Sequence, residues 1–368
     1  MNLHALRISH IWNGLQEVLF PFLEENLGPL TKKHKQLISI LEVISVESFI
    51  EEKKSKIGRP QKNRISLFYS FIAKMVLNIP FNFDLRDRLL CDNKLRKICG
   101  YNQANDVPSE STFSRAFAEF SINKTPEKLH KELIKASQLE RLIGHISRDG
   151  SEIEAREKPV RRKKLSKKQK KKFKRGRPKK GEIRPPQEVS KLEKQQDMTL
   201  EEMVESLPKK CDIGSKKNSK GHWHSWIGYK LHLDVADGQI PISCMLTSAS
   251  VHDSLTALPL SEMTKKRVTN LYDLMDAAYD SKIIRQKSEE MGHIPIIDFN
   301  KRRGEKKQFS PAKKQRYKER STVERVFGRL KDEFGGRMIR VKGHPKIMTH
   351  LMFGILALTA DQLIKFVI

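Results

Sequence analysis

IGYKLHLDVADGQIPISCMLT, residues 227–247, is the stretch of the sequence that decides the fold. From Ile227 to Val235 apolar and polar residues alternate, which is the pattern of a β-strand with one buried face. Asp237-Gly238 is a strong hairpin signal, and residues 240–247 supply a returning strand. The stretch therefore predicts a β-hairpin.

Downstream of this hairpin the pattern mixes strands with helices. An apolar strand is expected over residues 268–275, where it ends at Asp276, and a shorter one over 294–298. Helices are expected over residues 254–264, 280–291, about 311–334 and 344–367, the last of them amphipathic. The C-terminal half is thus a mixed α/β unit.

Upstream of the hairpin, the segment over 1–140 is predicted to be helical. The expected helices cover residues 6–27, 65–77, 83–99 and a segment that opens at 108–112, with Ser109 as its cap. The last two surround a short turn and resemble a helix-turn-helix, a geometry that often binds DNA. Two helices packed in a bundle fit the pattern equally well. A β-like run over 144–150 follows and ends in Asp149-Gly150.

Composition changes sharply after this run. From Lys158 to Lys180 there is no acidic residue, and 15 of the 23 positions are Lys or Arg. Such a block cannot form a core and is expected to be disordered or extended, with low-complexity character continuing to about residue 211. Arg175 and Arg177, in the order Arg-Gly-Arg-Pro, match the core of an AT-hook that enters a narrow minor groove. Non-specific phosphate binding is the simpler interpretation.

Charge points to a polyanionic partner. The chain carries 72 Lys and Arg against 44 Asp and Glu, a formal net charge of +28. Nucleic acid is the first candidate, because cationic side chains release its condensed counterions. A membrane is disfavoured, since the sequence has no uncharged apolar run long enough to cross a bilayer and no secretory signal. The four cysteines match neither zinc nor disulfide spacing and are expected to be reduced thiols in the cytoplasm.

One set of polar residues in the 311–334 helix has informative spacing. Tyr317, Arg320, Glu324 and Lys331 are separated by three, four and seven residues, so a regular helix would place them on one face. An ordinary surface ion pair between Arg320 and Glu324 would fit this spacing as well. A carboxylate between cations also suits a metal site beside phosphates.

Two further acids follow β-like runs. Asp149 closes the run over 144–150, and Asp276 ends the strand over 268–275 with small residues after it. Mg²⁺ prefers oxygen ligands and is usually held by a few carboxylates, waters and phosphates. Two such ions can activate a water or a 3′-hydroxyl and stabilise the leaving oxygen. Taken singly, an Asp at a strand end is common.

Together these motifs resemble bacterial insertion-sequence transposases of the DDE class, in the branch with a Tyr-x2-Arg-x3-Glu-x6-Lys motif. That motif is complete here from Tyr317 to Lys331. The branch's second-acid motif matches Asp276, Tyr279 and Asp280, and its first matches Asp149-Gly150. The interval from Asp276 to Glu324 has the length found in close relatives, whereas the longer interval from Asp149 to Asp276 includes the basic segment as an insertion.

The resemblance implies a ribonuclease-H-like catalytic domain over residues 141–157 and 212–368, preceded by a helical DNA-binding domain over 1–140 and interrupted by the basic insertion over 158–211. It also implies Mg²⁺, as two ions with Mn²⁺ as a substitute, held by Asp149, Asp276 and Glu324. The partners would be double-stranded DNA, as transposon ends and target, and a second copy of the chain in a synaptic homodimer.

The same resemblance assigns DNA phosphate contacts to Tyr317, Arg320 and Lys331, and places the protein in the cytoplasm at the bacterial nucleoid. A nuclease that cuts without joining, and a non-catalytic DNA-binding derivative, remain open from the sequence. Four neighbouring features receive a structural interpretation: Trp223 and Trp226 in the core, His252-Asp253 as an orienting pair for the next helix, and Asp273 inside the strand over 268–275.

Overall fold

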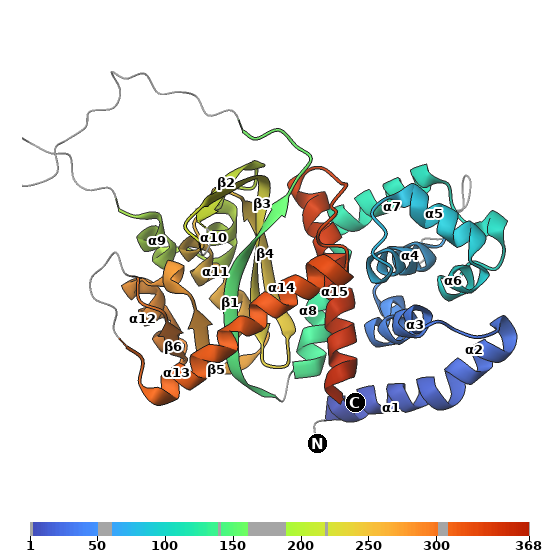
Figure 1. The fold of residues 1–368 in the computed structure, drawn as a ribbon, viewed down its shortest axis with the longest axis horizontal. Coiled ribbons are helices and arrows are strands. Elements are labelled where there is room, and N and C mark those ends of the chain that lie inside the picture. Colours follow the sequence, from blue (N-terminus) through green and yellow to red (C-terminus); the bar gives the residue numbers. More distant parts are fainter. Residues whose placement is uncertain are drawn as a thin grey trace, which may run out of the picture.

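The computed structural model describes residues 3–50, 61–138, 141–160, 189–217, 220–300 and 308–367. Within these residues the protein has a mixed sheet with helices on both faces, and a helical N-terminal region beside it (Figure 1). The long C-terminal helix α15, His344–Val367, lies between the two and contacts both. The expected division into helical and α/β parts therefore appears as two layers around one shared helix.

The described strands form a six-stranded sheet around the predicted hairpin. They are β1 (Leu142–Glu154), β2 (Asp212–Lys217), β3 (Trp223–Ala236), β4 (Ile240–Ser248), β5 (Thr269–Met275) and β6 (Ile294–Ile297). Their order is β2-β3-β1-β5-β6, with β4 also paired to β3. Strands β1, β5 and β6 run parallel, and β3 is antiparallel to β1, β2 and β4. This mixed sheet with flanking helices confirms the ribonuclease-H-like fold.

Alternation along β3 explains how both faces of the sheet are buried. Leu231 and Leu233 face the main core, where they join apolar residues of α14 (Ser321–Glu333) and α15. His232 and Asp234 point the other way and bond to Thr256 and Thr264 of α11, Ser254–Lys265. Successive side chains of a strand point to opposite faces, so the sheet is covered by α14 and α15 on one side and by α11 on the other.

Helices account for the described N-terminal region as predicted. They are α1 (Leu3–Gly14), a π-helical turn (Leu15–Leu19), α2 (Phe20–Leu27), α3 (Lys32–Ile44), α4 (Arg64–Val76), α5 (Asn82–Cys91), α6 (Asn93–Ile98), α7 (Glu110–Asn123) and α8 (Thr125–Gln138). Ser109 is the N-cap residue of α7, and its hydroxyl bonds that of Thr112 at 3.1 Å. The prediction of a single helix over residues 83–99 is wrong, because two helices cover this segment. Asp92 leaves the helical conformation there and caps α6 through the amide of Leu95.

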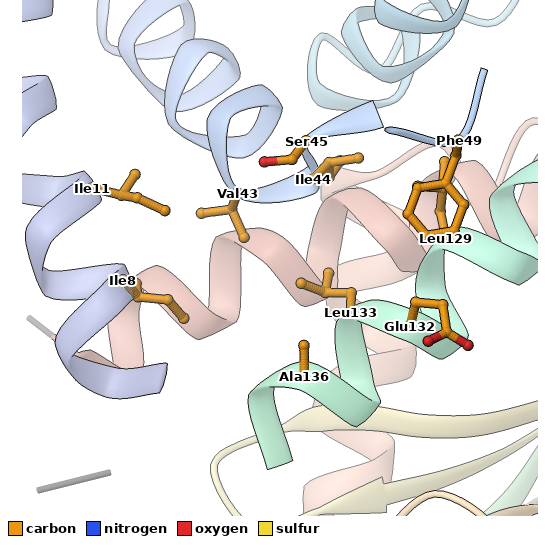
Figure 2. A pocket seen from close by; sticks show the side chains of 10 residues that line it. All are labelled: Ile8, Ile11, Val43, Ile44, Ser45, Phe49, Leu129, Glu132, Leu133 and Ala136. Carbon is orange, nitrogen blue, oxygen red and sulfur yellow. The ribbon is translucent and has the colours of Figure 1, made fainter. Parts of the chain in front are cut away.

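Figure 2 shows an apolar pocket where α1, α3 and α8 meet. Ile8, Val43 and Leu133 face one another across it, and its lining is aliphatic or aromatic apart from Ser45 and Glu132. Among the described residues this lining has no cationic side chain, so it carries no positive charge to attract a phosphate.

The helix α15 was predicted to be amphipathic, but it is buried on most of its surface. Phe353 packs against Phe68 and Phe71 of α4 with ring centroids 5.0 and 5.4 Å apart, and Leu356 and Leu358 are fully buried. By length and composition this helix could span a membrane, yet 89% of its apolar window is buried inside the protein. A helix that is apolar all round is either a core helix or a membrane span, and burial between two layers accounts for it here.

Three further segments differ from the sequence prediction. The β-like run over 144–150 is part of the longer β1, so Asp149 lies within the strand rather than at its end. Residues 189–211, expected to be of low complexity, form α9 (Lys191–Lys194) and α10 (Leu200–Ser206), and Met203 packs against Leu258 of α11. Arg175 and Arg177 lie outside the described residues, as does most of the basic segment.

The helix expected over 311–334 is interrupted near its middle. It consists of α13 (Pro311–Tyr317), a 3₁₀ turn (Lys318–Arg320) and α14. The helix α12 (Lys282–Glu290) matches its expected position, and a 3₁₀ turn that was not predicted (Ala277–Tyr279) lies between β5 and this helix.

Candidate active site

Asp149 and Asp276 come from neighbouring parallel strands in matching register. The final pair of the β1–β5 ladder is Arg148 with Met275; Asp149 is the next residue of β1, and Asp276 directly follows β5. Adjacent strands lie about 4.8 Å apart, so the two carboxylates start from neighbouring backbone positions. The sheet therefore brings together two acids that lie far apart in the chain.

A buried ion pair fixes the strand from which Asp149 projects. Nε and Nη2 of Arg148 bond the two carboxylate oxygens of Asp234 at 2.6 and 2.7 Å, and both side chains are almost fully buried. Arg148 points toward α11, where Nη1 also donates to Ser261. Because alternate residues face opposite sides, this anchor turns Asp149 toward α14.

Backbone amides orient both acids. The amide of Gly150 donates to Oδ1 of Asp149 at 2.7 Å. The amide of Ala278 donates to Oδ1 of Asp276 at 2.9 Å, in the 3₁₀ turn that follows β5. Each carboxylate is thus partly satisfied through one oxygen and leaves its other oxygen for a further partner.

The surroundings of Asp149 and Asp276 disfavour the ionised form of both carboxyl groups. Burial, with the charge of Asp276, raises the pKa of Asp149 to about 7. Burial and the charge of Asp253 also raise the pKa of Asp276. Two half-buried carboxylates that resist ionisation side by side are stabilised when a cation joins them. The donor chemistry therefore fits Mg²⁺.

Arg320 connects the sheet acids to Glu324 on α14. Its Nη1 lies 3.7 Å from Oδ2 of Asp149, and its Nη2 lies 2.5 Å from Oε1 of Glu324. The hydroxyl of Ser147 on β1 donates to the carbonyl of Glu319, which holds this turn against the sheet. Glu324 is thus one guanidinium away from Asp149, and its side chain is 53% exposed.

No three His, Cys, Asp or Glu side chains of the described ranges are close enough together to hold one metal ion. Asp149 and Asp276 are neighbours, but Arg320 occupies the place between Asp149 and Glu324. In this arrangement the predicted trio is therefore two adjacent acids and a third that is paired with an arginine.

The predicted stripe of Tyr317, Arg320, Glu324 and Lys331 is only partly contiguous. The guanidinium of Arg320 lies 6.0 Å from the ring centroid of Tyr317 and bonds Glu324. Lys331 instead interacts electrostatically with Glu152, three residues beyond Asp149 on β1, and burial lowers its pKa. The stripe therefore runs along β1 away from the acids.

Asp253 is an additional acid at the site, although its sequence context predicted only that it orients a helix. It precedes α11, and its charge raises the pKa values of both Asp149 and Asp276. Its Oδ1 lies 3.0 Å from Nζ of Lys230 on β3. The neighbouring His252 does orient the helix, since its Nδ1 accepts from the amide of Ser254.

Other expectations near the site have mixed outcomes. Trp226 is buried in the core as predicted, but Trp223 is 69% exposed beside Lys217, so its core assignment is wrong. Asp273 is buried and bonds Asn270, Ser288 and His293, which makes it structural.

Family models match both parts of the chain. The model described as "Transposase DDE domain" matches residues 140–360, and the one described as "Transposase domain (DUF772)" matches residues 25–119. The chain belongs to the transposase DDE domain family. The DDE domain match runs from the start of β1 into α15, so it includes the whole sheet and the acids described above. No curated protein and no solved structure matches the chain.

Proposed function

We propose that this transposase binds insertion-sequence ends, nicks them by metal-dependent hydrolysis and joins the freed 3′-hydroxyl ends to target DNA. Asp149, Asp276 and Glu324 are its catalytic acids in this proposal. The observation that carries it is the register of β1 and β5, which makes Asp149 and Asp276 neighbours in a half-buried position where one cation would relieve their repulsion.

Asp149 and Asp276 would hold the metal, with Mg²⁺ as the cofactor, two ions per site and Mn²⁺ as a substitute. When bound, such ions activate a water or a 3′-hydroxyl and stabilise the leaving oxygen of the phosphodiester. Glu324 would complete the set once Arg320 exchanges its carboxylate partners for a DNA phosphate. Arginine suits that exchange, because its planar fork matches phosphate and carboxylate alike.

Tyr317, Arg320 and Lys331 would hold the DNA strand beside the acids. Burial raises the pKa of Tyr317 to about 12, so its phenol keeps its proton and can donate it to a phosphate oxygen. Arg320 stays charged, because Tyr317, Glu324 and Asp149 raise its pKa against the effect of burial. Lys331, on α14 beside Glu152 of β1, would contact the same DNA strand some distance from the point of cleavage.

Binding of double-stranded DNA would extend beyond the sheet. The net charge of +28 supplies a strong, salt-dependent attraction to phosphates. The helical region and the basic segment with Arg175 and Arg177 would contribute to it, and two copies of the chain would join two ends as a homodimer. The bacterial nucleoid in the cytoplasm is the expected location.

A cleavage assay on DNA that carries the element's ends tests the proposal. The wild-type protein should nick these ends only with Mg²⁺ or Mn²⁺, and Asp276→Asn should remove the nicking. Glu289→Gln, an exposed charge removal on α12, is the matched control and should nick normally. Metal-dependent nicking that survives in Asp276→Asn would refute the assignment.

A second substrate with a pre-formed 3′-hydroxyl end separates transposition from simple cleavage. Joined product with target DNA is expected. Nicking without joined product would mean a nuclease, and binding without either reaction would mean a non-catalytic DNA-binding protein.

A further inference from the structure

Three polar side chains lie against the backbone next to Asp149, on the α11 side of the sheet. Oδ1 of Asp253 is 3.0 Å from Nζ of Lys230 and 3.6 Å from Nδ1 of His232. Lys230 and His232 come from β3, where His232 pairs with Gly150 in the ladder. An acid, a cation and a histidine therefore meet beside the residue that follows Asp149.

Gly150 makes this close approach possible. A Cβ at this position would lie 2.8 Å from Oδ1 of Asp253, 2.9 Å from Nδ1 of His232 and 3.1 Å from Cδ of Lys230. Two of these contacts are shorter than side chains tolerate, so any residue other than glycine would push Asp253 away. The glycine of the Asp-Gly motif thus admits a carboxylate to the neighbourhood of Asp149.

The carboxylate of Asp253 is held by charge more than by hydrogen bonds. Its Oδ1 is buried and has no hydrogen-bond partner among the described residues, although it is in ion-pair range of Lys230. His232 is fully buried and already bonds the hydroxyls of Thr247 and Thr256. Lys230 also donates to the carbonyl of Val251, so it is a fixed counter-ion.

We propose that Asp253 is a positioning acid for the divalent cation at Asp149 and Asp276, and that Lys230 is the counter-ion that limits its effect. This inference rests on the proposed function of that site. Asp253 adds a negative charge close to the two ligating carboxylates, where water screens it poorly, so it strengthens cation binding. The charge of Lys230 opposes it from the same place.

Direct titration of the DNA-free protein with Mg²⁺ and Mn²⁺ by calorimetry tests the inference without relying on turnover. Asp253→Asn should weaken binding by about 10- to 100-fold, as loss of a group that supports metal ligands does. The half-saturating Mg²⁺ concentration for nicking should rise in parallel, with activity recovering at high Mg²⁺. Glu262→Gln is the control on the same helix, where its carboxylate pairs with Lys287, and should bind like wild type.

Lys230→Met gives a second test with the opposite sign. Removal of the counter-ion should tighten cation binding severalfold, a gain that structural damage would not produce, so the inference stays testable even if Asp253→Asn fails to fold. Unchanged metal affinity in a folded Asp253→Asn, or weaker binding in Lys230→Met, overturns the inference. If the wild-type protein itself neither binds these ions nor nicks DNA, the proposed function fails instead.

Discussion

The sheet and the helix of the site hold their acids in different ways. Asp149 and Asp276 extend from strands whose backbone is tied by the buried pair of Arg148 and Asp234. Glu324 lies on α14 with a half-exposed side chain that pairs with Arg320. The sheet therefore fixes the positions of Asp149 and Asp276 in advance. The position of the Glu324 carboxylate instead depends on which group Arg320 binds.

The largest expected effect separates metal binding from catalysis. Asp149→Asn should abolish both cation binding and nicking, with a loss in nicking greater than the roughly 100-fold typical of an outer-shell partner. Glu324→Gln should lose nicking by a similar factor but keep most of the DNA-free cation affinity, because the sheet pair remains. Calorimetry and a nicking assay measure the two quantities, and equal loss of binding in both variants would erase the distinction between sheet and helix.

The next prediction concerns the anchor of the sheet. Arg148→Met leaves the carboxylate of Asp234 buried without its partner and should lower the free energy of unfolding by about 3–5 kcal/mol. Urea denaturation measures this. The double variant Arg148→Met with Asp234→Leu removes both charges and should recover much of the loss. A stable single variant would mean that the pair does not anchor β1.

Acidic pH should weaken the layers around the sheet. Burial lowers the pKa of His130 to about 3 and those of His232 and His350 to about 4, so all three are neutral in the folded protein. Their unfolded pKa is near 6.5, so the unfolded state binds more protons below that value. Stability is then full above about pH 6.5 and is lost as the pH falls toward 4, by up to ~1.4 kcal/mol per pH unit for each histidine.

Melting temperatures between pH 4 and 7.5 would check this dependence. His130 donates to the carbonyl of Pro241 on β4, so His130→Gln offers an uncharged donor and should flatten the curve. A melting temperature that does not change between pH 7 and 4.5 would contradict the prediction.

The smallest effect on stability is expected for the loss of Arg320, which pairs with Glu324 of α14. Arg320→Met should change the free energy of unfolding by less than about 1 kcal/mol, because its bond to Glu324 is largely exposed. The same variant should still lose nicking activity, since the guanidinium is assigned to a DNA phosphate. A large loss of stability would show that Arg320 is an anchor like Arg148.

The sequence predicted most elements because their patterns are local. The β3–β4 hairpin follows from alternation and Asp237-Gly238, and β5 from an apolar run that stops at Asp276. Several helices of the N-terminal region follow from periodicity, whereas α3 and α8 were included only in the general helical prediction for residues 1–140. The break at Asp92 was missed, because an Asp can either continue a helix or cap the next one, and neighbouring packing decides between them.

The candidate site was only partly predictable, because local patterns reveal contacts within one helix but not contacts between distant segments. Spacing on one helix placed Arg320 beside Glu324, and the hydrogen bond confirms that contact. The role of Asp253 was underestimated, because its approach to Asp149 depends on the missing side chain of Gly150, which lies about 100 residues earlier in the chain on β1. Contacts between segments that lie far apart in the chain leave no periodic signal.

By itself the sequence determined the kinds of elements, the large excess of positive charge and the three candidate acids, because propensity, periodicity and composition are properties of short segments. Tertiary structure alone decided which acids are neighbours. The parallel register of β1 and β5 joins Asp149 to Asp276, and Arg320 stands between Asp149 and Glu324. The physical reason is that strand pairing and burial are settled by the whole core, which also makes α15, expected as an amphipathic helix, the buried helix that both layers share.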